Sequence, residues 1–253
     1  MCDELIGMKH MLKTCKDSRM PPERIFVCVD NARPEDIDAI RTHWNDNNIK
    51  FIETKHNCKY PVNNFYKSAE SAVGLAKEHG ATEEDVIYVS PIDCIPNKGF
   101  YGEINRCTKN IIRQYKHKWQ ASVGYFFHPA RNRPTKYVQK GAPFHETLQY
   151  HKREPKDFEE WYSKEVNNYL YKGHVHKGSN WSDILYAPVI QPIKRWNELG
   201  GVCGGKFEDH SKTSWDGEYI KLGLKDGAIF SFLGVGVFHH DLKPELQKQR
   251  GWK

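Results

Sequence analysis

The chain has 253 residues, with a hydrophobic content of 38% and a charged content of 28%, which fit a globular protein with a polar surface. Its longest apolar run, from Ala228 to Phe238, is interrupted by glycines and is too short to span a bilayer, so we expect no membrane-spanning segment. The net charge of +6 suits an anionic ligand or partner without singling out nucleic acid.

The cysteines indicate a reducing environment. There are seven of them, and they form neither a CxxC pair nor a Cys/His zinc spacing. They stand at Cys2, Cys15, Cys28, Cys58, Cys94, Cys107 and Cys203. An odd number at irregular intervals favours reduced thiols and a cytoplasmic compartment, or a host cytoplasm for a viral protein.

Helices and strands are predicted to alternate through the first half of the chain. A helix over residues 3–19 precedes a near-continuous apolar run over 24–29, which is typical of a buried parallel strand. Pro34 and two acids then open a second helix. This second helix is predicted over residues 33–44. Further elements are predicted over 49–54 (strand), 63–79 (helix), 86–89 (strand), 102–115 (helix) and 121–127 (strand). This order predicts an α/β fold with right-handed crossovers between parallel strands.

The pattern weakens between residues 129 and 183, where basic and aromatic side chains are interleaved. The members of this mixture, with its flanks, are Lys116, Lys118, Arg131, Arg133, Lys136 and Lys140 with Trp119, Tyr125, Tyr137 and Tyr150. Such a mixture can bind nucleic acid by phosphate contact and stacking. The commoner alternative is a solvated face whose aromatics pack in a small core. Order returns with elements predicted over 184–190 (strand), 193–199 (helix), 217–224 (helix) and 228–238 (strand).

Asp93 lies shortly after the strand predicted over 86–89. Residues 86–96 run from strand character into a proline-bounded break, and Asp93 lies just past the expected strand end. Ligands of open α/β sheets bind outside the carboxyl ends of the strands, so Asp93 is placed to hold a metal ion or a nucleotide. The alternative is an aspartate that only caps a turn.

Taken in order, several pieces of the chain resemble the nucleotide-sugar-dependent glycosyltransferases of the GT-A fold, inverting family 2 type. These pieces are the strand that ends in Asp30, Pro91-Ile92-Asp93 at the place of the family's Asp-x-Asp motif, Gly200-Gly201 after a short helix, Trp215-Asp216 with Gly227 further on, and the strand that ends in His239. The resemblance covers about residues 5–241. Pro91 stands where the family has its first acid, and the family's first nucleotide-binding strand is missing here.

The resemblance implies a fold and a set of site residues. The fold would be a single GT-A (Rossmann-like) domain over residues 1–253, with a mostly parallel sheet flanked by helices. Residues 1–128 would bind the nucleotide, and residues 129–253 would bind the acceptor and carry the catalytic residue. Asp30, Asp93, Gly200 and Gly201 would bind the donor, Asp93 and His239 (or His240) would hold Mn²⁺ or Mg²⁺, and Asp216 would be the general base.

Each of these residues also has a structural alternative. Asp30 and Asp216 suit helix N-caps, and His239 and His240 suit the end of a strand. The pair Glu208-Asp209 is a rival for the base.

The function implied is the metal-dependent transfer of a sugar, with inversion, from a nucleoside diphosphate sugar such as a UDP-sugar to an acceptor hydroxyl. One candidate acceptor is a hydroxymethylated base in DNA, as in the enzymes that glycosylate phage-type DNA. The alternatives are a soluble glycan or protein acceptor, or a nucleotide-sugar-binding module without catalysis. A dinucleotide-dependent enzyme is disfavoured because no GxGxxG follows any predicted strand.

Overall fold

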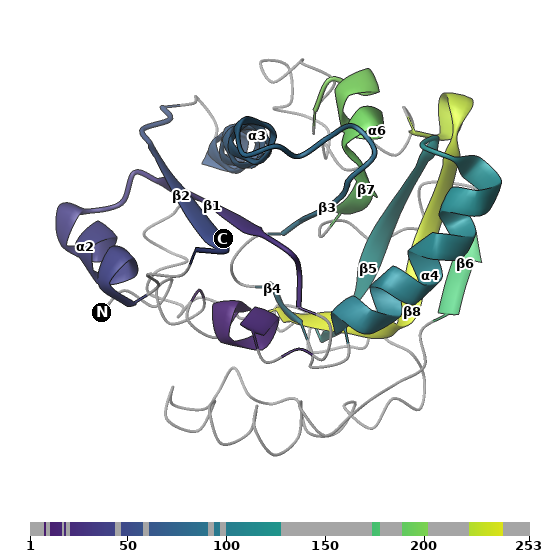
Figure 1. Ribbon diagram of the computed structural model, residues 1–253, viewed down its shortest axis with the longest axis horizontal. Helices are drawn as coiled ribbons and strands as arrows, with labels where there is room; N and C mark the ends of the chain where they lie inside the picture. The colour runs from purple at the N-terminus through teal and green to yellow at the C-terminus, as the bar shows by residue number, and fades with distance from the viewer. Residues whose placement is uncertain are drawn as a thin grey trace.

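The computed structural model describes residues 8, 11–16, 18, 21–43, 47–57, 61–90, 94–96, 100–127, 174–177, 189–201 and 223–239, some of them by their backbone alone. Its elements run in the order β1 (Ile25–Asp30), α2 (Pro34–His43), β2 (Ile49–Thr54), α3 (Pro61–Glu78), β3 (Val86–Val89), β4 (Cys94–Pro96), α4 (Phe100–Tyr115), β5 (Trp119–Phe127), β6 (His174–Lys177), β7 (Val189–Pro192), α6 (Ile193–Glu198) and β8 (Ala228–His239) (Figure 1). The predicted mixed α/β class is confirmed. Within the described ranges, no helix is long and apolar enough to cross a membrane.

The first two strands form a parallel pair of their own. Their register runs from Ile25 opposite Ile49 to Asp30 opposite Thr54, and α3 packs against both strands. The helical residues Met8 and Leu12 pack with Ile40 of α2, Val27 of β1 and Ile49 of β2 in one core. Because the strands are parallel, their carboxyl ends lie at the same edge, where ligands of α/β folds bind.

The remaining strands form a second sheet whose direction differs from the prediction. Its order is β3-β7-β5-β8-β4, with β6 also paired to β8. Among the described strands of this sheet, β5 and β8 pair in parallel, and the other four pairings are antiparallel. The prediction of a mostly parallel sheet is therefore wrong for these strands. An apolar run reports that a strand is buried on both faces, but it carries no information on the direction of its neighbour.

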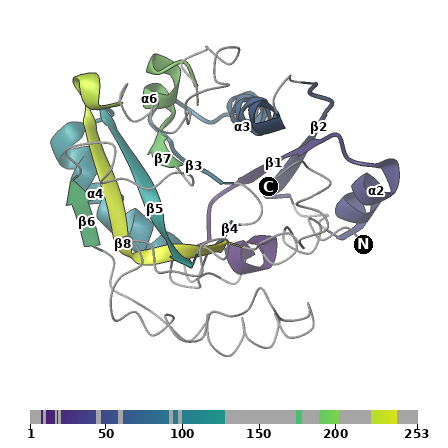
Figure 2. The same cartoon turned by 180° about the vertical axis from the view of Figure 1, so that it is seen from behind.

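One helix covers this second sheet with a regular apolar face. Phe100, Ile104, Cys107 and Ile111 recur along α4 at helical spacing and are all buried. They pack with Trp119 and Ala121 of β5, Ile190 of β7, and Ala228 and Phe230 of β8. Figures 1 and 2 show α4, β5 and β8 on one side of the molecule and the β1–β2 pair on the other.

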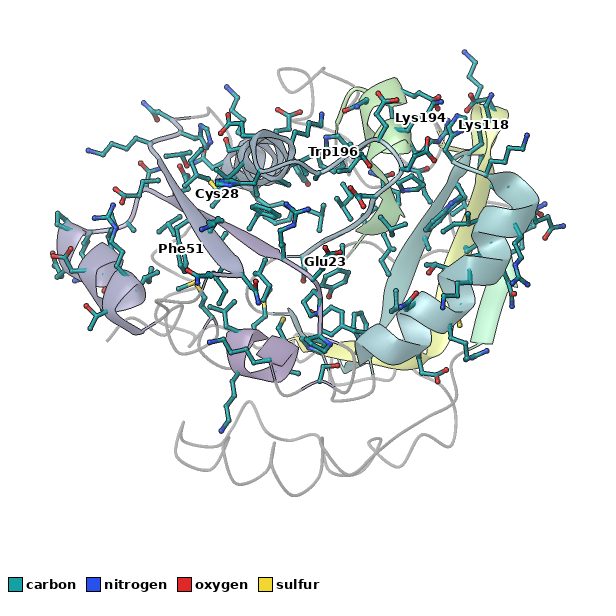
Figure 3. The ribbon with its side chains drawn as sticks, viewed as in Figure 1. Glu23, Cys28, Phe51, Lys118, Lys194 and Trp196 are labelled. Atoms are coloured by element: carbon teal, nitrogen blue, oxygen red, sulfur yellow. The ribbon has the colours of Figure 1, made fainter. Side chains whose placement is uncertain are left out.

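Helix α6 connects the two halves of this arrangement. Pro192 precedes it and offers no side-chain cap, but the amides of Ile193 and Lys194 donate to the carbonyls of Asp85 and Glu83, each at 2.9 Å. These bonds satisfy two of the amides that a helix start leaves open. Trp196 packs against Tyr66, Ala69 and Val73 of α3, and Figure 3 shows its side chain beside that helix.

Candidate functional site

A polar cluster lies at the carboxyl ends of β1 and β2, and Asp30 is at its centre. The Asp30 Oδ1 atom accepts hydrogen bonds from the Thr54 hydroxyl and from the backbone N–H of His56, both at 2.8 Å. Its Oδ2 atom accepts from Asn31 Nδ2 at 3.0 Å. These bonds join the end of β1 to the end of β2. Asp30 therefore links the two strand ends, and it is not the N-cap of α2, which begins at Pro34.

Asn31 adds two further hydrogen bonds between the strand ends through an unusual backbone conformation. Its φ is 53°, in the left-handed region that asparagine tolerates better than most residues. This conformation lets its backbone N–H donate to the Thr54 carbonyl at 2.9 Å and its side chain donate to the His56 carbonyl at 2.7 Å. The chain leaves β1 in a fixed direction as a result.

Hydroxyl and thiol groups of β1, β2 and α3 line the same edge. Cys28 contacts the Thr54 hydroxyl at 3.3 Å, and Figure 3 shows its sulfur pointing from β1 toward α3. Burial raises the pKa of the Cys28 thiol, although hydrogen bonds from Thr54 and Ser68 oppose the shift. His56 Nε2 lies 3.5 Å from the Ser71 hydroxyl of α3. The cluster thus offers several donors and acceptors at an edge that suits a polar ligand.

The pairing of β4 with β8 concerns the chain next to the two predicted metal ligands. In this antiparallel pair Cys94, the residue after Asp93, lies opposite His239. Asp93, Asp216 and His240 lie outside the described residues, and His239 is described by its backbone alone. Among the residues described with their side chains, no three acids, histidines or cysteines form a group that could hold a metal.

The predicted Gly-Gly turn follows α6 as expected, and the backbone conformation of both residues favours glycine. Gly200 and Gly201 have φ values of 71° and 79°, in the left-handed region. A Cβ atom on Gly201 would lie 2.5 Å from Glu70 Oε1 of α3. Burial raises the pKa of Glu70, with Lys67 acting in the opposite direction.

Glu70 is a residue that sequence reasoning missed. A half-buried acid beside a close-packed glycine turn is a candidate for a functional role, since perturbed acids gather at such sites. The available signal was an acid directly after Ala69 on the helix face that packs inward.

One aromatic residue of the predicted basic and aromatic surface, Trp119, is buried in the core instead. Trp119 is 0% exposed, packs in the core beside α4, and donates from its indole N–H to the Lys116 carbonyl at 3.0 Å. It cannot stack on a base. Lys118 Nζ lies 3.6 Å from Asp226 Oδ2. The other predicted members at residues 131, 133, 136, 137, 140 and 150 lie outside the described residues, and Tyr125 is described by its backbone alone.

Comparison with known proteins identifies no family for the chain. No protein-family model matches it, and no curated protein matches it in sequence.

Proposed function

We propose that this protein transfers a sugar from a nucleoside diphosphate sugar to an acceptor hydroxyl, with inversion, on a GT-A-like fold. Support comes first from the order β1–α2–β2–α3, in which a parallel pair places a polar cluster around Asp30 at its carboxyl edge. A nucleotide with its many hydroxyl, ring and phosphate groups is the kind of ligand such an edge can bind.

The observation that carries the proposal is the β4–β8 register. Residues near 93 and near 239 are far apart in sequence, yet Cys94 and His239 are partners in one strand pair. A metal site built from Asp93 and His239 requires such a juxtaposition, and neither residue's local sequence pattern demands it. The donor set, a carboxylate oxygen and an imidazole, fits Mn²⁺ well and Mg²⁺ through the oxygen. When bound, the ion would neutralise negative charge that develops on the leaving diphosphate.

Two further residues complete the proposal. Asp216 is the general base that accepts the proton of the acceptor hydroxyl, a role worth about a hundred- to ten-thousand-fold in rate. The Asp30 cluster holds the nucleotide through its donors and acceptors, since the carboxylate retains acceptor capacity on Oδ2 beyond the bond from Asn31.

For the acceptor, we propose a hydroxymethylated base in DNA ahead of a neutral glycan. The net charge of +6 favours an anionic acceptor. Phosphate contacts would make the acceptor affinity fall steeply with salt, whereas the affinity for a neutral glycan would change little.

The test is a turnover assay with Mn²⁺ and a panel of nucleotide sugars, in which release of nucleoside diphosphate is followed with and without hydroxymethylated DNA. We expect release that requires metal and acceptor, is lost in Asp93→Asn, and survives in the control Asp38→Asn, which changes an exposed acid of α2. Donor binding without release would favour the non-catalytic module. Neither binding nor release with any donor would overturn the proposal.

A further inference from the structure

The outer face of helix α4 carries a row of basic side chains. Arg106, Lys109 and Arg113 recur at every third or fourth position of the helix, and Lys116 directly follows its last turn at the same spacing. Residues so spaced are neighbours along one side of a helix. All four are exposed, and they are called the α4 basic stripe below. From its first to its last member the helix rises by about 15 Å.

The sheet behind α4 fixes the direction in which the stripe faces. The opposite side of the helix packs Ile104, Cys107 and Ile111 against β5, β7 and β8. Figures 1 and 2 show α4 lying along β5 and β8, on the side of the molecule away from the β1–β2 pair. Because burial of one side sets the rotation of the helix about its axis, the basic side chains are held on the side away from the sheet.

The described residues neutralise little of the charge of the stripe. Glu103 is the one acid in the sequence of α4, and it pairs with Arg106 at 2.8 Å. Among the residues that the structure describes, no carboxylate pairs with Lys109, Arg113 or Lys116. The helix dipole favours a cation in the last turn, where Arg113 lies, but its effect does not extend back to Lys109. An excess of positive charge along the whole stripe suits an anionic partner.

A lysine from a distant strand adds to the same surface. Lys177, at the end of β6, is exposed and donates to the Tyr115 hydroxyl at 3.0 Å. Its Nζ atom also lies 5.0 Å from the centre of the Tyr115 ring, as in a cation–π contact. Because Tyr115 is the last residue of α4, these contacts bring a further ammonium group to the C-terminal end of the stripe.

The dimensions and the chemistry of the stripe fit the backbone of duplex DNA. Each strand of a duplex presents one phosphate per about 3.4 Å of its axis, so about four phosphates lie along the length of the stripe. Asn105, Asn110 and Gln114 are also exposed on α4, and side-chain amides of this kind donate to phosphate oxygens.

Two other polyanions fit the same surface less well. Helix α4, every residue of which is described, carries no exposed aromatic side chain on which the bases of a single strand could stack. Helices that bind membrane surfaces insert an apolar face into the lipid, whereas the apolar face of α4 is buried against the sheet.

We propose that the outer face of α4 is a docking surface for the phosphate backbone of duplex DNA, with Lys109, Arg113 and Lys116 making the contacts. The inference rests on the proposed function only in taking this DNA to be the acceptor, since the contact itself needs neither donor sugar nor metal. Lysine and arginine bind phosphate through charge-assisted hydrogen bonds. Such contacts position a duplex without reading its sequence.

The test measures binding of the 253-residue chain to a fluorescent DNA duplex of arbitrary sequence, by anisotropy, over a series of salt concentrations and without donor or metal. The stripe variant combines Lys109→Gln, Arg113→Gln and Lys116→Gln. Vesicles of phosphatidylcholine with phosphatidylserine are the second probe. Turnover with hydroxymethylated DNA is measured separately.

A matched control separates the position of the charges from their number. It combines Lys13→Gln, Lys67→Gln and Lys77→Gln, which lie at exposed helical positions outside α4. Both triple variants lower the net charge of +6 by three. Because all the substituted side chains are exposed, both variants should fold, and circular dichroism checks that they do.

We expect the stripe variant to bind the duplex about ten-fold more weakly or worse at low salt. The slope of log affinity against log salt should become shallower by about two to three, since each lost phosphate contact removes about 0.9. The control should bind within about three-fold of the wild type, because salt screens charges that lie beyond a Debye length from the DNA.

Three results would overturn the docking surface. Equal weakening in the two triple variants would show that net charge alone attracts the DNA. Absence of duplex binding by the wild type would contradict the surface outright, and binding to the vesicles but not to the duplex would assign the stripe to a membrane surface instead. Stripe-dependent DNA binding without any turnover would overturn the proposed function and support the docking surface.

Discussion

At the scale of single residues, the candidate site owes its shape to polar groups that bond to one another across strand ends. Asp30 accepts hydrogen bonds from the Thr54 hydroxyl and from the His56 amide. The residue that the family resemblance assigns to nucleotide binding therefore also holds two strands together. The strand end that it follows could be predicted from the apolar run over 24–29. Its bonding partners could not, because Thr54 and His56 become neighbours only once β1 and β2 pair in parallel register.

Removal of the Asp30 carboxylate should destabilise the protein. We expect Asp30→Ala to lower the free energy of unfolding by about 1.5–3 kcal/mol, as for hydrogen bonds to a charged group. Asp38→Ala, at an exposed position on α2, is the control and should change it by less than about 0.5 kcal/mol. Urea unfolding of both variants measures the difference. Equal free energies of unfolding for Asp30→Ala and Asp38→Ala would show that the hydrogen bonds of Asp30 do not stabilise the fold.

Removal of the Glu70 carboxylate should instead stabilise the protein at neutral pH. Burial raises the pKa of its carboxyl in the folded chain, so ionisation costs more in the folded than in the unfolded state. The wild type therefore loses stability as the pH rises above the unfolded pKa of about 4.3. Glu70→Gln should melt at a higher temperature than the wild type at pH 7 and at the same temperature near pH 3.5. Glu78→Gln, at an exposed position of the same helix, is the control for removal of a carboxylate from α3. A lower melting temperature for Glu70→Gln than for the wild type at pH 7 would contradict the destabilising role of the Glu70 charge.

At the scale of elements, local patterns located the helices and strands but left their partners open. The predicted strand over 49–54 and the helix over 63–79 match β2 and α3 closely, because periodicity and breakers are local properties. The strands β4 and β6 were missed, since three or four residues are too few to show alternation. Of the helix predicted over 217–224, residues 223 and 224 are helical, the turn continues to residue 226, and the rest lies outside the described residues.

The apolar face of α4 provides a matched pair of positions for a stability measurement. Ile111 is 4% exposed and packs under the six-stranded sheet, whereas its neighbour Ile112 is 40% exposed. We expect Ile111→Ala to lower the free energy of unfolding by about 2–5 kcal/mol, through lost apolar contact and the cavity left behind. Ile112→Ala should cost less than about 1 kcal/mol at its surface position. Similar losses at the two positions, measured by urea unfolding, would contradict the assigned face of the helix.

At the scale of the whole molecule, long-range pairing decides which residues can act together. Strand β8 pairs in parallel with β5 and antiparallel with β4. Residues near 120 and near 94 therefore both lie beside β8, which is formed much later in the sequence. Local sequence patterns do not show which strands pair. The proximity of the chain near residue 93 to the chain near residue 239 could therefore be expected only from the family resemblance. Hydrogen bonds join Asp30 at the end of β1 to Thr54 and His56 at the end of β2.

The central claim is that Asp93 and His239 converge on one divalent ion. It is tested most directly by electron paramagnetic resonance of Mn²⁺ binding, in the presence of UDP, to the wild type, Asp93→Asn, His239→Ala and the control His79→Ala, which changes an exposed histidine at the end of α3. Because each ligand contributes to one coordination shell, we predict that the first two variants each bind Mn²⁺ at least about ten-fold more weakly, while the control binds like the wild type. Wild-type affinity in either Asp93→Asn or His239→Ala would contradict a shared ion at the β4–β8 pair.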